Sequence, residues 1–278
     1  MLFRSLYFEK ANDLMSSTKN VSCTNCSSTN DAFGGVYVKN SVDIQFHDLS
    51  VTDPGNGALA VEVDNANLNF NGWVDIHGLD IQANRTGPVF QLVDTEARIS
   101  GVRLYGAHNG MVWDGREVSL TSSLSDVVLS GSNCLEFTDL HLVEAVDIDV
   151  SACTGQINFR DSTVNMSNSI QGTSVAFDMT GQPSTLRWID SGDLGTLNVG
   201  VGSLVDEMWS LHVWATNQHN HGLPNAVVNL SFNQFEADQT HTLPYSGHTI
   251  IGPFSAQQTD WIDRKSTRLN SSHRCISY

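Results

Sequence analysis

Residues 135–150 have the sequence LEFTDLHLVEAVDIDV, and two short runs within them decide the fold: Leu135-Glu-Phe137 and Val146-Asp-Ile148-Asp-Val150. In both runs apolar and polar residues alternate, which is the period of a β-strand that buries one face. The strands are only three to five residues long, and polar corners separate them. Strands this short are unsuited to the hairpins of a sandwich and favour one coil of a β-helix.

The same opening tripeptide recurs along the first two hundred residues. Each copy is followed by a second alternation, as in Val42-Asp-Ile44-Gln-Phe46, and usually by a turn rich in Gly and Asn. The blocks have a period of roughly 20 to 30 residues, which is typical of solenoid repeats. Leu6-Tyr-Phe8 lines up with the first full copy. The copies are Val36-Tyr-Val38, Val61-Glu-Val63, Phe90-Gln-Leu92, Met111-Val-Trp113, Leu135-Glu-Phe137 and Ile157-Asn-Phe159.

This pattern resembles the right-handed parallel β-helix family, also called the pectin-lyase-like fold, over residues 1–205. The resemblance lies in the architecture and in no catalytic motif. It implies an all-β solenoid whose strands pair with the same strand of the next coil. The alternative is a conventional β-sandwich, in which strands recur about every 8 to 12 residues. The recurring tripeptide and the shortage of two-residue hairpin signals favour the solenoid.

The pattern changes after Val205. Residues 209–215 form a longer alternating strand, a polar turn follows, and residues 223–232 resume the alternation. This order resembles the opening of an Ig-like or carboxypeptidase-regulatory-like β-sandwich, so we expect residues 206–262 to begin a second, truncated module. Residues 263–278 resemble a translated sequencing adapter, so the fold is interpreted without them. We therefore expect the chain to be a fragment of a longer protein.

The composition excludes some partners. The chain has 14 Lys and Arg against 30 Asp and Glu, a net charge of −16, so it lacks the basic surface that nucleic acid requires. No run of about 18 apolar residues is present, so no membrane span is predicted. The fold implies an extracellular or cell-surface location, although the first residues lack the apolar stretch of a signal peptide.

Acidic residues recur at the corner that follows the opening strand. Lys39 or Asn40 and Asp64 or Asn65 occupy this corner in the earlier blocks. Stacked carboxylates repel or share a cation, so Ca²⁺ at this column is one hypothesis. In the calcium-dependent polysaccharide lyases of this fold, such carboxylates hold Ca²⁺ and an Arg or Lys removes the proton; the resemblance would assign that role to Arg116 or Arg160. The simpler hypothesis is that the Asp side chains cap tight corners. The acidic residues concerned are Asp94, Asp114, Asp139 and Asp161.

Cysteines and histidines offer weaker signals. Cys23-Thr-Asn-Cys26 has metal or redox spacing but no second pair. Cys134 and Cys153 are close to one coil apart, which permits a bridge outside the cell, although buried thiols are the simpler expectation. Five histidines gather in the second module, where we expect turn and surface positions rather than a metal site; they are His212, His219, His221, His241 and His248.

No catalytic constellation is evident. We therefore expect a secreted or cell-surface structural or adhesive protein that binds a polysaccharide or a cell-surface glycan. The alternative is a polysaccharide lyase or glycoside hydrolase that uses carboxylates of the groove, with or without Ca²⁺. Asp114, Arg116, Asp139, Arg160 and Asp161 would then carry the catalysis.

Overall fold

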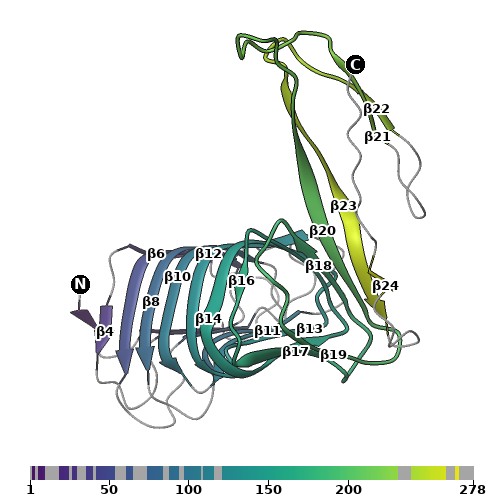
Figure 1. The fold of residues 1–278 in the computed structure, drawn as a ribbon. Helices are drawn as coiled ribbons and strands as arrows, with labels where there is room; N and C mark the ends of the chain where they lie inside the picture. Colours follow the sequence, from purple (N-terminus) through teal and green to yellow (C-terminus); the bar gives the residue numbers. More distant parts are fainter. Residues whose placement is uncertain are drawn as a thin grey trace.

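The computed structural model describes a chain built from β-strands (Figure 1). The described residues are 2–3, 6–9, 19–24, 27–29, 36–39, 42–53, 61–64, 74–83, 88–93, 97–107, 109–115, 121–230, 239–260 and 267–268. The described residues contain no helical segment that could span a membrane.

Two stacks of parallel strands form a solenoid. Stack A contains β3 (Lys19–Thr24), β6 (Val42–Asp53), β8 (Val74–Ala83), β10 (Ala97–Ala107), β12 (Thr121–Ser132), β14 (Leu142–Arg160), β15 (Thr163–Ser167), β18 (Thr185–Ile189) and β20 (Leu204–Trp214). Stack B contains β2 (Leu6–Glu9), β5 (Val36–Lys39), β7 (Val61–Asp64), β9 (Pro88–Val93), β11 (Asn109–Asp114), β13 (Leu135–Thr138), the end of β14, β17 (Val175–Met179) and β19 (Thr196–Val199). Short strands β1 (Leu2–Phe3), β4 (Ser27–Thr29) and β16 (Ile170–Gln171) pair with this framework.

The register of stack B confirms the repeat. Leu6 pairs with Val36, and the opening tripeptides then stack from coil to coil as far as Leu135-Glu-Phe137 and the end of β14. The predicted all-β fold and its parallel β-helix are therefore correct. Stacking works because a period of two sends each copy's apolar residues to the same, interior face.

Aromatic side chains fill the interior of the later coils. Trp113, Phe137, Phe159, Phe177 and Trp188 are buried, and each ring contacts the next along the solenoid at centroid distances of 5.5 to 6.3 Å. Tilted and edge-on ring pairs of this kind contribute roughly 0.5–1.5 kcal/mol each beyond the area they bury. The ring column ties successive coils together through the core.

Stack A bends at one column of left-handed residues. The strands stay in register on both sides of the bend, so one residue per coil carries a positive φ there. Only Gly, and to a lesser degree Asn and Asp, tolerates this conformation. The column contains Asp48, Gly78, Gly101, Asp126, Asp147, Asn168 and Asp190.

Buried serines bridge the corner where the chain passes from stack B to stack A. The Leu140 N–H donates to Ser162 Oγ and the Ser162 N–H donates to Ser184 Oγ, each at 3.2 Å. The Ser184 N–H donates in turn to Ser203 Oγ at 3.1 Å. Each serine hydroxyl accepts a hydrogen bond from a backbone N–H of the preceding coil. The hydroxyls thus satisfy buried amides that would pair with backbone carbonyl groups in an uninterrupted strand ladder. We call this row the serine ladder.

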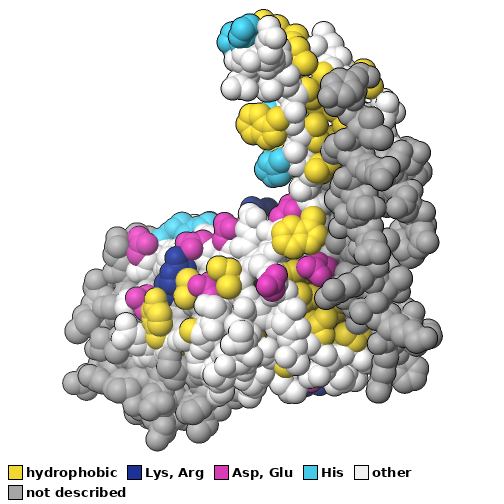
Figure 2. Space-filling model, viewed as in Figure 1, with side chains coloured by type: hydrophobic (Ala, Val, Ile, Leu, Met, Phe, Trp, Pro, Cys, Tyr) yellow, Lys and Arg dark blue, Asp and Glu magenta, His cyan; other side chains and the backbone are white. Residues whose placement is uncertain are grey.

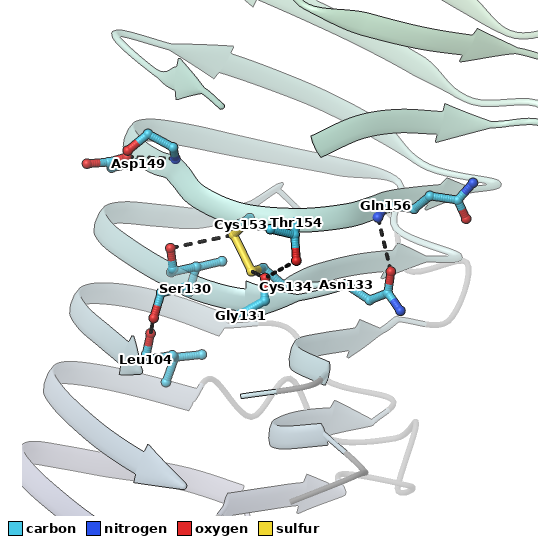
Figure 3. Close-up of a disulfide and its surroundings, with 11 residues drawn as sticks. Leu104, Ser130, Gly131, Asn133, Cys134, Asp149, Cys153, Thr154 and Gln156 are labelled. Atoms are coloured by element: carbon cyan, nitrogen blue, oxygen red, sulfur yellow. Dashed lines mark hydrogen bonds between the residues drawn. A yellow bond between two sulfur atoms is a disulfide. The ribbon is translucent and has the colours of Figure 1, made fainter. Parts of the chain in front are cut away.

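Cys134 and Cys153 form a disulfide between successive coils (Figure 3). Both residues are completely buried, and their Cα atoms are 5.9 Å apart. Beside the bridge, Asn133 Oδ1 accepts a hydrogen bond from the Gln156 N–H of the next coil at 3.0 Å. The expectation of buried thiols is therefore wrong for this pair, because the coil stacking brings the two side chains within bonding distance. Cys26 and the Cys23 side chain lie outside the described residues.

An antiparallel ribbon leaves the C-terminal end of the solenoid (Figure 1). Residues 204–208 of β20 still pair with β18, while the whole of β20 pairs with β23 (His248–Asp260). A small hairpin of β21 (Val227–Leu230) and β22 (Gln239–Thr242) accompanies the ribbon, and the short β24 (Thr267–Arg268) pairs with β23. The predicted boundary at residue 205 thus falls inside β20, because one strand serves both the solenoid and the ribbon.

Candidate functional site

An open groove of about 400 Å³ follows the corner between stacks B and A. Successive coils each contribute a short segment to it, so the groove runs along the solenoid axis rather than around one coil. Its lining residues are Asp139, Leu140, His141, Asp161, Ser162, Thr163, Pro183, Ser184, Thr185 and Gly202.

Two of the predicted site residues, Asp139 and Asp161, meet in this groove. They follow Thr138 and Arg160, which are paired in adjacent coils, and the Asp139 N–H donates to the Arg160 carbonyl oxygen at 2.9 Å. Both have left-handed backbones, with φ of 52° and 48°. The two carboxyl groups therefore belong to one column, about one strand spacing (~4.8 Å) apart along the backbone.

Asp114 does not belong to that column. It pairs with Val93 in the preceding coil and with Thr138 in the next, one position before Asp139. The predicted alignment of Asp114 with Asp139 is therefore wrong by one residue. The buried side chains of Met111 and Trp113 set the register of β11 against its neighbouring strands, and the Asp at the corner does not. Asp94, Arg116, Asn40 and Asn65 lie outside the described residues, and Lys39 and Asp64 pair with each other in the backbone register of stack B.

Arg160 is directed to another partner. Its Nε lies 3.4 Å from Glu136 Oε1, and the Asn158 amide donates to the other Glu136 oxygen at 3.4 Å. Arg160 is not among the groove-lining residues, and in the described part of the chain no Arg or Lys lines the groove. The arrangement of carboxylates with a neighbouring Arg that the lyase hypothesis requires is therefore not seen in the described part of the groove.

The side chains on the floor of the groove are engaged in hydrogen bonds, whereas several side chains at its rim can bind a ligand. Ser162 and Ser184 on the floor are buried, and their hydroxyls take part in the serine ladder. At the rim, the register places Thr163 beside Thr185. Within the described residues, the side chains of His141, Asp161, Thr163 and Thr185 have no hydrogen-bond partner, so these groups can serve a ligand.

Two Asp residues outside the predicted column, Asp149 and Asp178, make Asx-type contacts with the backbone two residues on. Asp149 Oδ1 accepts from the Ser151 N–H at 2.9 Å, and Asp178 Oδ1 accepts from the Thr180 N–H at 3.1 Å. These bonds are the capping chemistry expected for Asp at tight turns. For the predicted Ca²⁺ site, no group of three or more His, Cys, Asp or Glu that could hold a metal occurs among the described residues. Calcium binding at Asp94, Asp114, Asp139 and Asp161 stays a prediction.

The histidines of the ribbon lie in two settings. His219 and His221 belong to a turn, as predicted, where Asn217 Oδ1 accepts from both backbone N–H groups at 2.8 and 3.1 Å. His212 and His248 instead lie on opposite strands of the ribbon, with ring centroids 6.1 Å apart. His248 also stacks on Trp214. The sequence does not predict this pair, since only the register of β20 against β23 brings the rings together.

The groove is thus a shallow polar track with two carboxylates, one imidazole and two threonine hydroxyls along it. It offers hydrogen bonds at the spacing of the coils, and its open shape leaves room for an extended ligand. No protein-family model, no curated protein and no solved structure matches the chain. The chemistry of the groove therefore carries the functional argument.

Proposed function

We propose that this chain is part of a secreted or cell-surface structural or adhesive protein whose solenoid binds a polysaccharide or a cell-surface glycan along its coils. The pectin-lyase-like relationship, and the Ig-like identity of residues 206–262 as a spacer, belong to this proposal. The observation that carries it is the groove, in which Asp139 and Asp161, then Thr163 and Thr185, repeat from one coil to the next.

The periodicity of the groove suits an extended glycan. Neighbouring coils are about 4.8 Å apart, a distance comparable to the length of one sugar unit in an extended chain. A carboxylate accepts hydrogen bonds from sugar hydroxyls, and a threonine hydroxyl or a neutral imidazole can both donate and accept. The rigid serine ladder beneath these groups keeps them in place, which lowers the entropic cost of binding.

Direct binding measurements test the proposal. The whole chain would be screened by affinity electrophoresis against soluble neutral and acidic polysaccharides, together with the variants Asp161→Asn and His141→Ala. We expect retarded migration in at least one polysaccharide and a loss of retardation, by about tenfold in affinity, for both variants.

A matched control is Asp147→Asn. Asp147 is exposed and has a left-handed backbone like Asp161, but it lies at the bend of stack A and does not line the groove. Its replacement should leave binding unchanged. If no polysaccharide or cell-surface glycan retards the folded wild-type chain, the proposal is wrong.

A further inference from the structure

The outer part of the ribbon, together with the hairpin, carries an uncharged surface on an acidic protein. We define the arm as the described residues 209–230 and 239–255; they contain no Asp, Glu, Lys or Arg, although the chain has a net charge of −16. Figure 2 shows this division, with acidic side chains on the solenoid and mainly hydrophobic, histidine and uncharged groups on the described part of the arm. A surface without fixed charge suits a neutral ligand rather than an ionic one.

One face of the arm is buried and the other exposes aromatic rings. Leu211 and Val213 pack with Leu230, Ile251 and Phe254 in a small core between the ribbon and the hairpin. The alternation of β20 therefore sends His212 and Trp214 to the opposite face, where the Trp214 side chain is 68% exposed. The core of the arm does not require this exposed indole.

Trp214 is held as a flat platform. It is the cross-strand neighbour of His248, and the two rings stack with centroids 3.8 Å apart and planes inclined by 28°. His248 in turn lies near His212, at 6.1 Å between centroids. Because the imidazole supports one side of the indole, the ring loses little freedom when a ligand covers its exposed part.

A polar hollow lies on the hairpin side of the same arm. It has a volume of about 460 Å³, runs between β22 and β23, and reaches Ile250, which pairs directly with His212. Gln239, His241, Thr242 and Thr249 contribute polar groups to it. These donors and acceptors give the uncharged arm a second polar feature, on the face opposite the indole.

We propose that the Trp214–His248 platform binds a pyranose ring of a neutral glycan. The apolar C–H face of such a ring would stack on the indole, while its hydroxyls would bond the imidazole of His212 on the same face. The arm has no Lys or Arg among its described residues for a uronate or sulfate, so a neutral sugar is the ligand its chemistry selects. This inference rests on the proposed glycan binding and adds a second contact, separate from the groove.

The test uses the whole chain with two neutral polysaccharides, a soluble β-glucan and a xylan, and follows retardation in gels and tryptophan fluorescence. Trp214→Ala should weaken binding of a neutral polysaccharide by about tenfold, and Trp214→Phe should restore part of it. The control is Tyr245→Ala, because Tyr245 is 87% exposed at a turn of the arm without a stacked imidazole. It should bind like the wild type, and thermal unfolding of all variants checks that they fold.

The outcomes separate the two proposals. If Trp214→Ala binds neutral glycans like the wild type while Asp161→Asn loses binding, the platform is refuted and the groove stands. Binding of acidic polysaccharides alone also refutes the platform and leaves the groove. If Trp214→Ala changes only the self-association of the chain, measured by light scattering, the exposed face is an interface between copies and the proposal is overturned. Absence of all glycan binding overturns both.

Discussion

Cys134 and Cys153 are covalently joined across two successive coils, with their Cα atoms 5.9 Å apart in a fully buried setting. The bridge lies just before β13 and within β14, beside the corner where Asn133 caps the next coil. It therefore restrains the stacking of two of the coils that form the groove, those that contribute Asp139 and Asp161.

Removing this bridge should destabilise the solenoid. A cross-link that closes a loop of this size stabilises by about 3 kcal/mol through the unfolded chain. We expect Cys134→Ala/Cys153→Ala to lower the free energy of unfolding by about that amount in guanidinium melts under oxidising conditions. Treating the double variant with reductant controls for any effect of the other cysteines. Equal unfolding midpoints for the wild type and the double variant would contradict a stabilising bridge.

The serine ladder should be sensitive to the loss of a single hydroxyl. Ser184→Ala removes the acceptor for the Ser162 N–H and leaves that buried amide unpaired. An unpaired buried donor costs about 1–3 kcal/mol, so urea unfolding should shift to lower concentration by a corresponding amount. Ser174→Ala is the matched control, since Ser174 is exposed. A variant of Ser184 as stable as this control would show that the ladder contributes nothing.

The left-handed column should discriminate among side chains at one position. Asp147 has φ of 58° and is exposed, so a substitution there tests the backbone rather than packing. Asp147→Val should cost about 1–2 kcal/mol because a β-branched residue is strained in this region. Asp147→Asn should be nearly neutral. Thermal unfolding compares the two, and a neutral Val variant would mean that the bend relaxes to another conformation.

The lyase alternative makes a separate prediction. The described groove-lining residues include two carboxylates and a histidine but no Arg or Lys. We therefore expect no absorbance from unsaturated uronates when the folded protein is incubated with polygalacturonate or alginate, with or without Ca²⁺. A product signal that disappears in Asp161→Asn would instead support catalysis at the groove. A signal unaffected by that variant but lost in Arg116→Ala would place the reaction elsewhere in the predicted column.

The fold was predictable because each coil repeats a local pattern. The alternation in Leu135-Glu-Phe137 indicates which two side chains face inward. The same two positions of the tripeptide face the interior in every coil, because the tripeptides pair in register. The corner residues were harder to align. Asp114 and Asp139 are both Asp, but in the strand register they differ by one position. The side chain of a surface Asp does not pack in the core, so it does not determine the register.

The amino-acid sequence by itself determined an acidic, all-β, repetitive chain whose apolar pairs stack into a solenoid, because these properties follow from composition and from a period of two. The tertiary structure decided which distant residues meet. The Cys134–Cys153 bond, the groove shared by Asp139 and Asp161, and the stacking of Trp214 on His248 each depend on the register between strands far apart in the chain. A shift of one residue would turn each of these side chains to the other face, so only the assembled coils and ribbon bring them together.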